Sequence, residues 1–202
     1  MVKGKGDQAR TEILEVAKRL FLSQGYGNTS MRDIAKAAGN RAVAGIYNHF
    51  TNKEELFRAL IEDFSPYEEL VMTLEQTTGD TAQEFLTSAL RSVLPLLLKH
   101  FDFVELAQID VREFQGRNIE RMAQSLIIPR VLMVVQRVMT LPGIKPVEPY
   151  VVMRIMAGMV LSYALTEYAA PRMILAQLTT EEWIDRYVDF VISGLTTDPH
   201  KG

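Results

Sequence analysis

Apolar residues recur at helical spacing in nearly every segment of this chain, and no segment alternates apolar and polar positions with a period of two. The first clear stripe has the i, i+3, i+4, i+7, i+8 spacing of one helix face and comprises Ile13, Val16, Ala17, Leu20 and Phe21. The pattern therefore predicts an all-α fold, with about nine helices.

Three helices are predicted in the first 50 residues, and the second and third are short. Gly25 stands where a left-handed residue would end the first helix, Ser30 can cap the second, and Gly39 ends it. In the third, one apolar face is formed by Val43, Ile46, Tyr47 and Phe50. The opposite face carries one arginine and small side chains, namely Arg41, Ala42, Ala44 and Gly45.

A capping box of Thr51 and Glu54 is predicted to open a fourth helix that continues to about Glu75, with Pro66 kinking or ending it. Further helices are expected over about 80–101, 103–114, 117–140 with a kink at Pro129, 148–168 and 180–194. The last two are apolar around most of their circumference and so have two surfaces to bury. We expect a homodimer through about 148–168 and 180–194; the alternative is that both helices lie at the centre of a monomer core.

Composition adds a charge gradient to this picture. The 202 residues carry 22 Lys and Arg against 25 Asp and Glu, a net charge of −3. Residues 1–53 hold nine basic and four acidic side chains, net +5, which leaves −8 for the remaining 149 residues. The chain is therefore predicted to have a basic N-terminal part and an acidic remainder.

The chain has no cysteine, which excludes disulfides and Cys-rich zinc sites. The longest apolar run, Ile155 to Leu165, is 11 residues, short of the roughly 18 to 20 that a membrane helix needs. The N-terminus lacks the apolar stretch of a signal peptide. We therefore expect a cytoplasmic protein.

Two short helices joined by a tight glycine turn and supported by a longer helix match the helix-turn-helix pattern, whose second helix enters the DNA major groove. Small outward side chains on that helix permit close approach to base edges, and Arg41 can pair with guanine. Groups suited to phosphate stand around it: Thr29, Ser30, Tyr47, His49 and Lys53.

Here the sequence resembles the tetracycline-repressor (TetR) family of bacterial transcriptional regulators. The resemblance runs from Ile13 to Leu60 and rests on three ordered stretches, which are Ala17…Leu20-Phe21…Gly25-Tyr26…Thr29-Ser30, Asp33-Ile34-Ala35…Ala38-Gly39, and Ile46-Tyr47-Asn48-His49-Phe50…Asn52-Lys53-Glu54-Glu55-Leu56. It implies a three-helix DNA-binding domain at 1–53, an effector-binding and dimerisation domain at 54–202, and a homodimer.

The resemblance also implies residue roles. Tyr47, His49 and Lys53 match backbone anchors, Thr29 and Ser30 match phosphate partners, and the base-reading surface corresponds to Arg41, Ala42, Ala44 and Gly45. Gly39 to Tyr47 spans eight positions where many members have seven, so the base contacts at 40–45 are assigned to within one place.

Plainer interpretations remain open at this stage. Tyr47 could complete the core stripe, Arg41 and Lys53 could be solvated surface charges, and His49 could have no partner. Lys3, Lys5 and Arg10 form either an arm for the minor groove or a solubilising tail.

The remainder of the chain shows no catalytic set and no glycine-rich phosphate loop. Acidic residues follow His100 in the sequence, but their spacing is that of solvated helix charges. We therefore expect neither an enzyme nor a metal or cofactor site. Where the family resemblance implies an effector cavity, apolar residues able to line it are Phe101, Phe103, Phe114, Met122, Met156, Met159 and Tyr163.

The sequence therefore predicts a ligand-responsive transcriptional regulator, a repressor that a hydrophobic small molecule releases from a palindromic double-stranded DNA operator. Two alternatives remain: a DNA-binding protein of the same fold without an effector, and a helical small-molecule-binding protein without DNA function.

Overall fold

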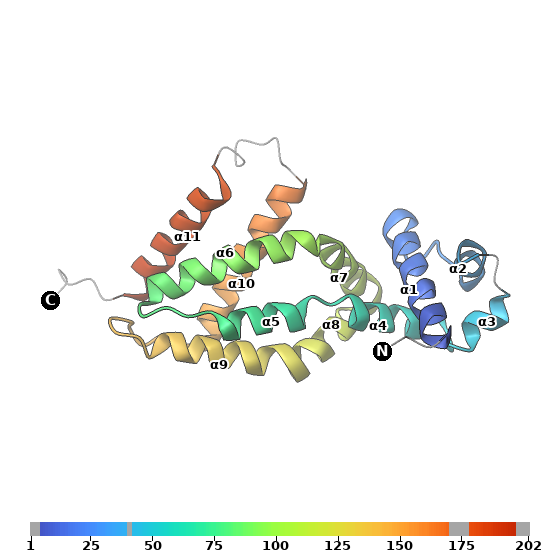
Figure 1. Ribbon diagram of the computed structural model, residues 1–202, viewed down its shortest axis with the longest axis horizontal. Coiled ribbons are helices and arrows are strands. Elements are labelled where there is room, and N and C mark those ends of the chain that lie inside the picture. The colour runs from blue at the N-terminus through green and yellow to red at the C-terminus, as the bar shows by residue number, and fades with distance from the viewer. Residues whose placement is uncertain (1–4, 40–41, 170–177, 197–202) are drawn as a thin grey trace. The chain divides into compact units, whose positions relative to one another are not determined.

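The computed structural model describes residues 5–39, 42–169 and 178–196, and within these ranges nearly all regular structure is helical (Figure 1). The described residues contain a single isolated bridge, between Ile144 and Thr196, and no strand. The all-α prediction is therefore confirmed.

The chain divides into two compact units, and it passes between them more than once. The head unit comprises Met1–Ser65 and Asp102–Met122, and the body unit comprises Pro66–Phe101 and Ala123–Gly202. The expected boundary after Lys53 separates a DNA-binding domain from an effector-binding domain, and this division by function stays a prediction. The contact-based division adds a second segment, Asp102–Met122, to the head.

The head unit contains six helices in the part of it that the structure describes. They are α1 (Lys5–Gln24), α2 (Met31–Ala37), α3 (Val43–Tyr47), α4 (Lys53–Phe64), most of α7 (Phe101–Phe114) and α8 (Arg117–Met122). Gly25 follows α1 with a φ of +88° and Gly39 follows α2 with a φ of +83°, the left-handed conformation that glycine adopts without strain. Both predicted helix ends are confirmed.

Two of the nine expected helices are each divided, so the described residues form α1 to α11. The helix expected to run from Thr51 to Glu75 ends at Phe64, and α5 (Tyr67–Gln76) begins after Pro66, because proline cannot continue the hydrogen-bond ladder. The helix expected over 117–140 is interrupted by a π-helical segment, Ala123–Ile127, before α9 (Ile128–Met139), which has Pro129 in its first turn.

The predicted capping box of Thr51 and Glu54 is wrong by one residue. Asn52 is the cap of α4, with its side-chain oxygen 2.8 Å from the Glu55 backbone nitrogen. The Glu55 carboxylate returns to the Thr51 backbone nitrogen at 2.7 Å. Asparagine caps a helix as well as threonine does, so the shifted box satisfies the same orphan donors.

The body unit is built on α6 (Ala82–Lys99), which contacts α5, α9, α10 (Pro149–Ala169) and α11 (Thr180–Leu195). One apolar cluster joins α6, α10 and α11, with buried members Leu86, Leu90, Leu94, Val152, Tyr163, Ile184, Val188, Val191 and Leu195. Pro95 lies within α6 without ending it.

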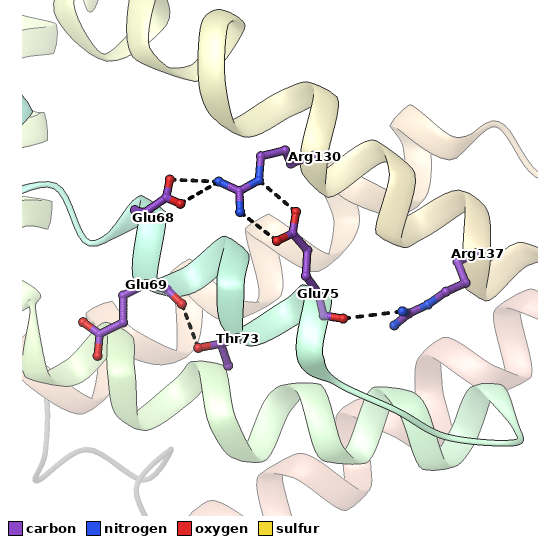
Figure 2. Close-up of polar contacts among 6 residues, drawn as sticks. All are labelled: Glu68, Glu69, Thr73, Glu75, Arg130 and Arg137. Carbon is purple, nitrogen blue, oxygen red and sulfur yellow. Dashed lines mark hydrogen bonds and ion pairs between the residues drawn. The ribbon is translucent and has the colours of Figure 1, made fainter.

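Arg130 on α9 joins that helix to α5, as Figure 2 shows. Its guanidinium donates to both carboxylate oxygens of Glu75 at 2.8 and 2.7 Å and to Glu68 at 2.9 and 2.8 Å. Arg137, two turns further along α9, donates to the Thr77 backbone oxygen at 2.6 Å. A planar guanidinium matches the fork of a carboxylate, so this pairing fixes the register of the two helices.

Helix α10 is long and apolar enough, from Pro149 to Tyr168, to cross a membrane by length and composition alone, and it is the one such unbroken helix among the described residues. The expectation that no segment reaches spanning length is therefore corrected. Arg154 stands directly before the 11-residue apolar run and limits it on that side, but a single charge does not end the helix. Only 17% of this stretch is buried within the single chain, so α10 presents much apolar surface.

Candidate nucleic-acid interface

The first helix of the candidate helix-turn-helix, α2, is closed at its start by the predicted serine cap. The Ser30 hydroxyl accepts from the Asp33 backbone nitrogen at 3.2 Å, and the Asp33 carboxylate accepts from the Ser30 backbone nitrogen at 2.9 Å. The Ser30 hydroxyl also donates to the Asp33 carboxylate at 2.5 Å. This bond, followed by the one from the Ser30 backbone nitrogen, holds the pKa of Asp33 below its usual range, because the ionised carboxylate is the better acceptor. The α2 N-terminus is thereby fixed where a phosphate contact was predicted.

The third helix, α3, is short and carries small residues on its outer side. Ala42 and Ala44 are exposed, and a Cβ placed on Gly45 would meet no other atom within 4 Å. Ile46 is fully buried beneath them and anchors the helix to the head core. Arg41 lies outside the described residues, so its base contact stays a prediction.

Tyr47 and His49 follow the buried Ile46 and differ from it in exposure. Tyr47 is 50% exposed, so it does not complete the core stripe that the helical spacing gave it. His49 is half-buried, with its ring 6.4 Å from that of Phe50. The α3 stripe therefore holds Ile46 and the buried Phe50 inward and leaves the Tyr47 ring in contact with solvent.

Thr29 and Lys53 are engaged within the protein. Thr29 is 1% exposed, and its hydroxyl donates to the Gly25 backbone oxygen at 2.9 Å. The Lys53 ammonium donates to the backbone oxygens of Tyr26 and Thr29, both at 2.9 Å, and lies 4.1 Å from the centroid of the Tyr26 ring. Their contacts with phosphate stay predictions. Sequence patterns missed the part played by Tyr26, because its partner Lys53 is 27 residues away in the chain.

Of the basic residues near the N-terminus, Arg10 is bonded within the folded head. Arg10 pairs with Asp63 on α4, with one bond of 3.1 Å, and its guanidinium lies 5.6 Å from the centroid of the Phe50 ring. Bonding to Asp63 raises the pKa of Arg10 above its ordinary value. Arg10 therefore belongs to the folded head, whereas Lys3 lies outside the described residues.

The residues expected to line an effector cavity are distributed over both units. Phe101, Met156, Met159 and Tyr163 belong to the body, where Phe101 stacks on Tyr168 with centroids 3.7 Å apart and Tyr163 bonds Thr180 at 2.9 Å. Within the head unit lie Phe103, Phe114 and Met122, all of them buried.

The acidic residues near His100 have other partners. Asp102 accepts from Lys18 at 2.9 Å, and Asp110 is fully buried and accepts from Asn118 at 2.7 Å and from the Ile119 backbone nitrogen at 3.0 Å. In the described ranges no group of three or more His, Cys, Asp or Glu side chains could hold a metal ion. Asp110 therefore closes the start of α8.

A short supported helix pair with a small-residue outer face, an exposed tyrosine and a basic segment is the arrangement of helix-turn-helix DNA-binding proteins. Residues 13–60 match the family model described as "Bacterial regulatory proteins, tetR family". The helix-turn-helix segment of this chain is therefore similar to that of the TetR family. The fold of the whole chain is similar to that of a solved regulatory protein of the tetR family from Rhodococcus RHA1, with a TM-score of 0.67 at 17% sequence identity over 97% of this chain and all of that one.

Curated relatives match about a third of this chain. The HTH-type transcriptional repressor KstR2 of Rhodococcus jostii is 42% identical over 67 residues, which cover 31% of this chain and 32% of the relative. The HTH-type transcriptional regulator AcrR of Shigella flexneri is 47% identical over 60 residues, covering 30% of this chain and 27% of AcrR. The match thus spans about a third of the length of these relatives.

The fold of the whole chain is similar to that of NalD, the secondary repressor of the MexAB-OprM multidrug efflux pump in Pseudomonas aeruginosa. The two structures have a TM-score of 0.66 at 22% sequence identity, over 97% of this chain and all of NalD. The likeness in fold covers the body unit as well as the head unit.

Proposed function

We propose that this protein is a cytoplasmic transcriptional repressor that binds a near-palindromic operator as a homodimer and is released from it by a hydrophobic small molecule. The observation that carries the proposal is α3, whose outer side combines the small residues Ala42, Ala44 and Gly45 with the exposed ring of Tyr47. A helix enters the major groove only where its side chains leave room for the base edges.

The proposed DNA surface follows from that helix. Arg41, Ala42, Ala44 and Gly45 read bases, while Tyr47, His49 and the Ser30 end of α2 contact the phosphate backbone. The excess of basic side chains in residues 1–53 supplies the attraction that the acidic remainder lacks.

The proposed homodimer uses the apolar surface of α10 and α11. Val151, Ile155 and Leu161 are 47%, 49% and 43% exposed at spacings that place them along one side of α10, and Phe190 on α11 is 74% exposed. A patch of this kind is typical of a surface that another protein covers. A two-fold copy would present two α3 helices to half-sites about 34 to 36 Å apart, which is why the operator is expected to be a near-palindrome.

The proposed effector is hydrophobic or aromatic. In the body unit, Met156, Met159 and the Phe101 ring supply apolar, adaptable surface. NalD, whose fold this chain shares, represses a multidrug efflux pump, which supports an effector of drug-like character. A coupling of about 1 to 3 kcal/mol between effector and operator would weaken DNA binding about 5- to 150-fold.

The test is operator binding by fluorescence anisotropy, with DNA from upstream of the protein's own gene compared with random DNA of equal length. We expect wild type to prefer the upstream palindrome and the double variant Arg41→Ala, Tyr47→Ala to lose that preference. The control Val111→Ala changes an exposed side chain of α7 and should bind as wild type does. Equal affinity for both DNAs would refute the DNA-binding proposal.

A second measurement separates a ligand-gated repressor from a DNA-binding protein without an effector. A ligand that binds only the folded state must raise the Tm, so a panel of hydrophobic compounds is screened by thermal shift and each hit is added to the operator complex. Hits that release the operator support the proposed effector. Hits that raise the Tm without releasing DNA contradict it.

A further inference from the structure

Lys53, the first residue of α4, is half-buried, and its side chain bonds the loop before α2. Its ammonium has three neighbours: the Tyr26 oxygen, the Thr29 oxygen and the Tyr26 ring. A charged donor that satisfies two carbonyls of one loop ties that loop to the helix carrying the donor. Lys53 therefore fixes the segment Gly25–Ser30 against α4.

That segment leads directly into the helix-turn-helix. Its first residue, Gly25, is left-handed, and Gln24 donates to the Thr29 hydroxyl at 3.1 Å, which in turn donates to Gly25. The next residue is Ser30, the cap of α2. Any shift of the Tyr26 and Thr29 carbonyls is therefore passed to the first turn of α2.

The Tyr26 ring connects this loop to α7. It lies 4.1 Å from the Lys53 ammonium, 5.4 Å from the Phe57 ring and 5.0 Å from the Phe114 ring, the ring distances being between centroids. Burial, followed by the charges of Glu54 and Glu113, raises the pKa of Tyr26 to about 12, so the phenol is neutral at physiological pH. The Tyr26 ring thus packs against the Phe57 and Phe114 rings and also contacts the Lys53 ammonium.

Phe114 ends α7, which together with α8 forms the head segment Asp102–Met122, and residues of the body unit precede and follow this segment in the chain. Helix α7 follows α6 in the chain, and α8 leads into the π-helical segment and α9. The turn after Phe114 is tightly defined, with Gln115 and Gly116 at φ values of 58° and 77°. Arg117 holds the turn by donating to the Phe114 oxygen at 3.2 Å and pairing with Glu54 at 3.7 Å.

We propose that Lys53 and Tyr26 are positioning residues for the helix-turn-helix, and that Phe114 is the contact through which the α7–α8 segment sets their position. This inference rests on the proposed function and names the regulation of the same site. A displacement of α7–α8 withdraws Phe114 from Tyr26, the clamp on the Gly25–Ser30 loop loosens, and α2 loses its fixed start.

Salt dependence distinguishes a positioning lysine from a phosphate contact. Each lysine that neutralises a phosphate contributes about −0.9 to the slope of log K against log salt concentration. We expect Lys53→Met to lower operator affinity about tenfold, because a charge-assisted clamp is lost, with an unchanged slope. Lys99→Met removes a lysine from the body unit and is the matched control, with neither affinity nor slope altered.

Hydrogen exchange tests the link to Phe114 without any DNA. Phe114→Leu keeps an apolar side chain in the buried position and removes the ring that contacts Tyr26. Exchange at the backbone amides of Thr29, Asp33 and Ile34 should be about tenfold faster in Lys53→Met and in Phe114→Leu. Phe85→Leu, which removes a buried ring from the body unit, should leave these amides unchanged.

The salt-dependence and hydrogen-exchange experiments can be distinguished from a failure of the proposed function. If wild type shows no operator preference, the repressor proposal fails, and the exchange arm still decides whether Phe114 and Lys53 hold the loop. A salt slope reduced by about 0.9 in Lys53→Met would make Lys53 a phosphate contact and overturn its positioning role. Unchanged exchange in Phe114→Leu would overturn the link to α7–α8.

Discussion

Ile46 and Tyr47 are neighbours on α3 with opposite surroundings: Ile46 is fully buried, while the Tyr47 ring is 50% exposed. A five-residue helix has little packing area, so a single buried isoleucine, supported by Phe50 after the helix, holds it to the head. The rest of α3 is free to be selected for DNA. Stability and recognition are therefore separable residue by residue on this helix.

Substitutions at Gly45 should separate stability from DNA recognition most clearly. A Cβ at this position meets nothing within 4 Å, and its φ is not positive, so Gly45→Ala should stabilise the protein by about 0.5 to 1 kcal/mol, as glycine costs helix stability. Gly45→Leu should fold with a Tm at least as high as that of wild type, because leucine also favours helix over glycine, yet bind operator about tenfold more weakly, because the added side chain occupies the space needed by base edges.

Thermal melts and operator titrations measure both effects. Gly194→Ala on α11 also adds a Cβ in open space, so it controls for the effect of a helix glycine on the Tm. If Gly45→Leu binds the operator as tightly as wild type, then α3 does not lie in the groove.

The head could be predicted in outline because its signals are local. The Ser30 cap, the left-handed Gly25 and Gly39, and the buried Ile46 all follow from spacing and residue chemistry within one turn. Where two adjacent residues offered equivalent chemistry, as Thr51 and Asn52 do, the spacing did not decide between them, and the structure uses Asn52.

The tertiary part of the site could not be predicted in this way. Nothing in the local pattern pairs Lys53 with the carbonyl of Tyr26, or brings Phe114 to within 5.0 Å of the Tyr26 ring. For the same reason Thr29 was expected outside, since a threonine in a polar loop gives no local sign that its hydroxyl turns inward to Gly25.

The exposed stripe of α10 predicts how the homodimer can be broken. Ile155→Glu places a charge in the apolar surface that includes Val151 and Leu161, and burying an unpaired carboxylate is strongly unfavourable. We expect the variant to sediment as a folded monomer where wild type sediments as a dimer, and to lose most of its operator affinity because only one half-site is held.

Val111→Glu, on a still more exposed apolar position of α7, is the control and should sediment as wild type does. A dimer that persists in Ile155→Glu would show that another surface joins the copies.

Helix caps predict the acid limit of stability. Hydrogen bonds from Ser30, Thr51 and Thr179 hold the pKa values of Asp33, Glu55 and Glu182 below their ordinary 3.8, 4.5 and 4.5. A carboxyl whose folded pKa is depressed stabilises the fold above its unfolded pKa and loses that contribution as pH falls through the folded one. The Tm contribution of these caps should therefore be constant down to about pH 5 and fall below about pH 4.5.

Glu182→Gln isolates one such cap. The amide has nearly the same shape but no charge, so the variant should melt below wild type at pH 7, and the difference should shrink as the pH falls below the ordinary value of 4.5. A difference in Tm that stays constant from pH 7 to pH 3 would contradict the assignment of a depressed pKa to Glu182.

Asp110 predicts a coupling within the α7–α8 turn. Its fully buried carboxylate accepts from the Asn118 amide at 2.7 Å and from the Ile119 backbone nitrogen at 3.0 Å, so its removal leaves two donors without their acceptor. Asp110→Ala should destabilise the protein by about 1 to 3 kcal/mol in urea titrations. Asn118→Ala, which removes one donor and leaves the Ile119 bond, should cost less.

In the double variant the two effects should be less than additive, because the Asp110–Asn118 bond can be lost only once. Strict additivity would mean that the two side chains do not interact in solution.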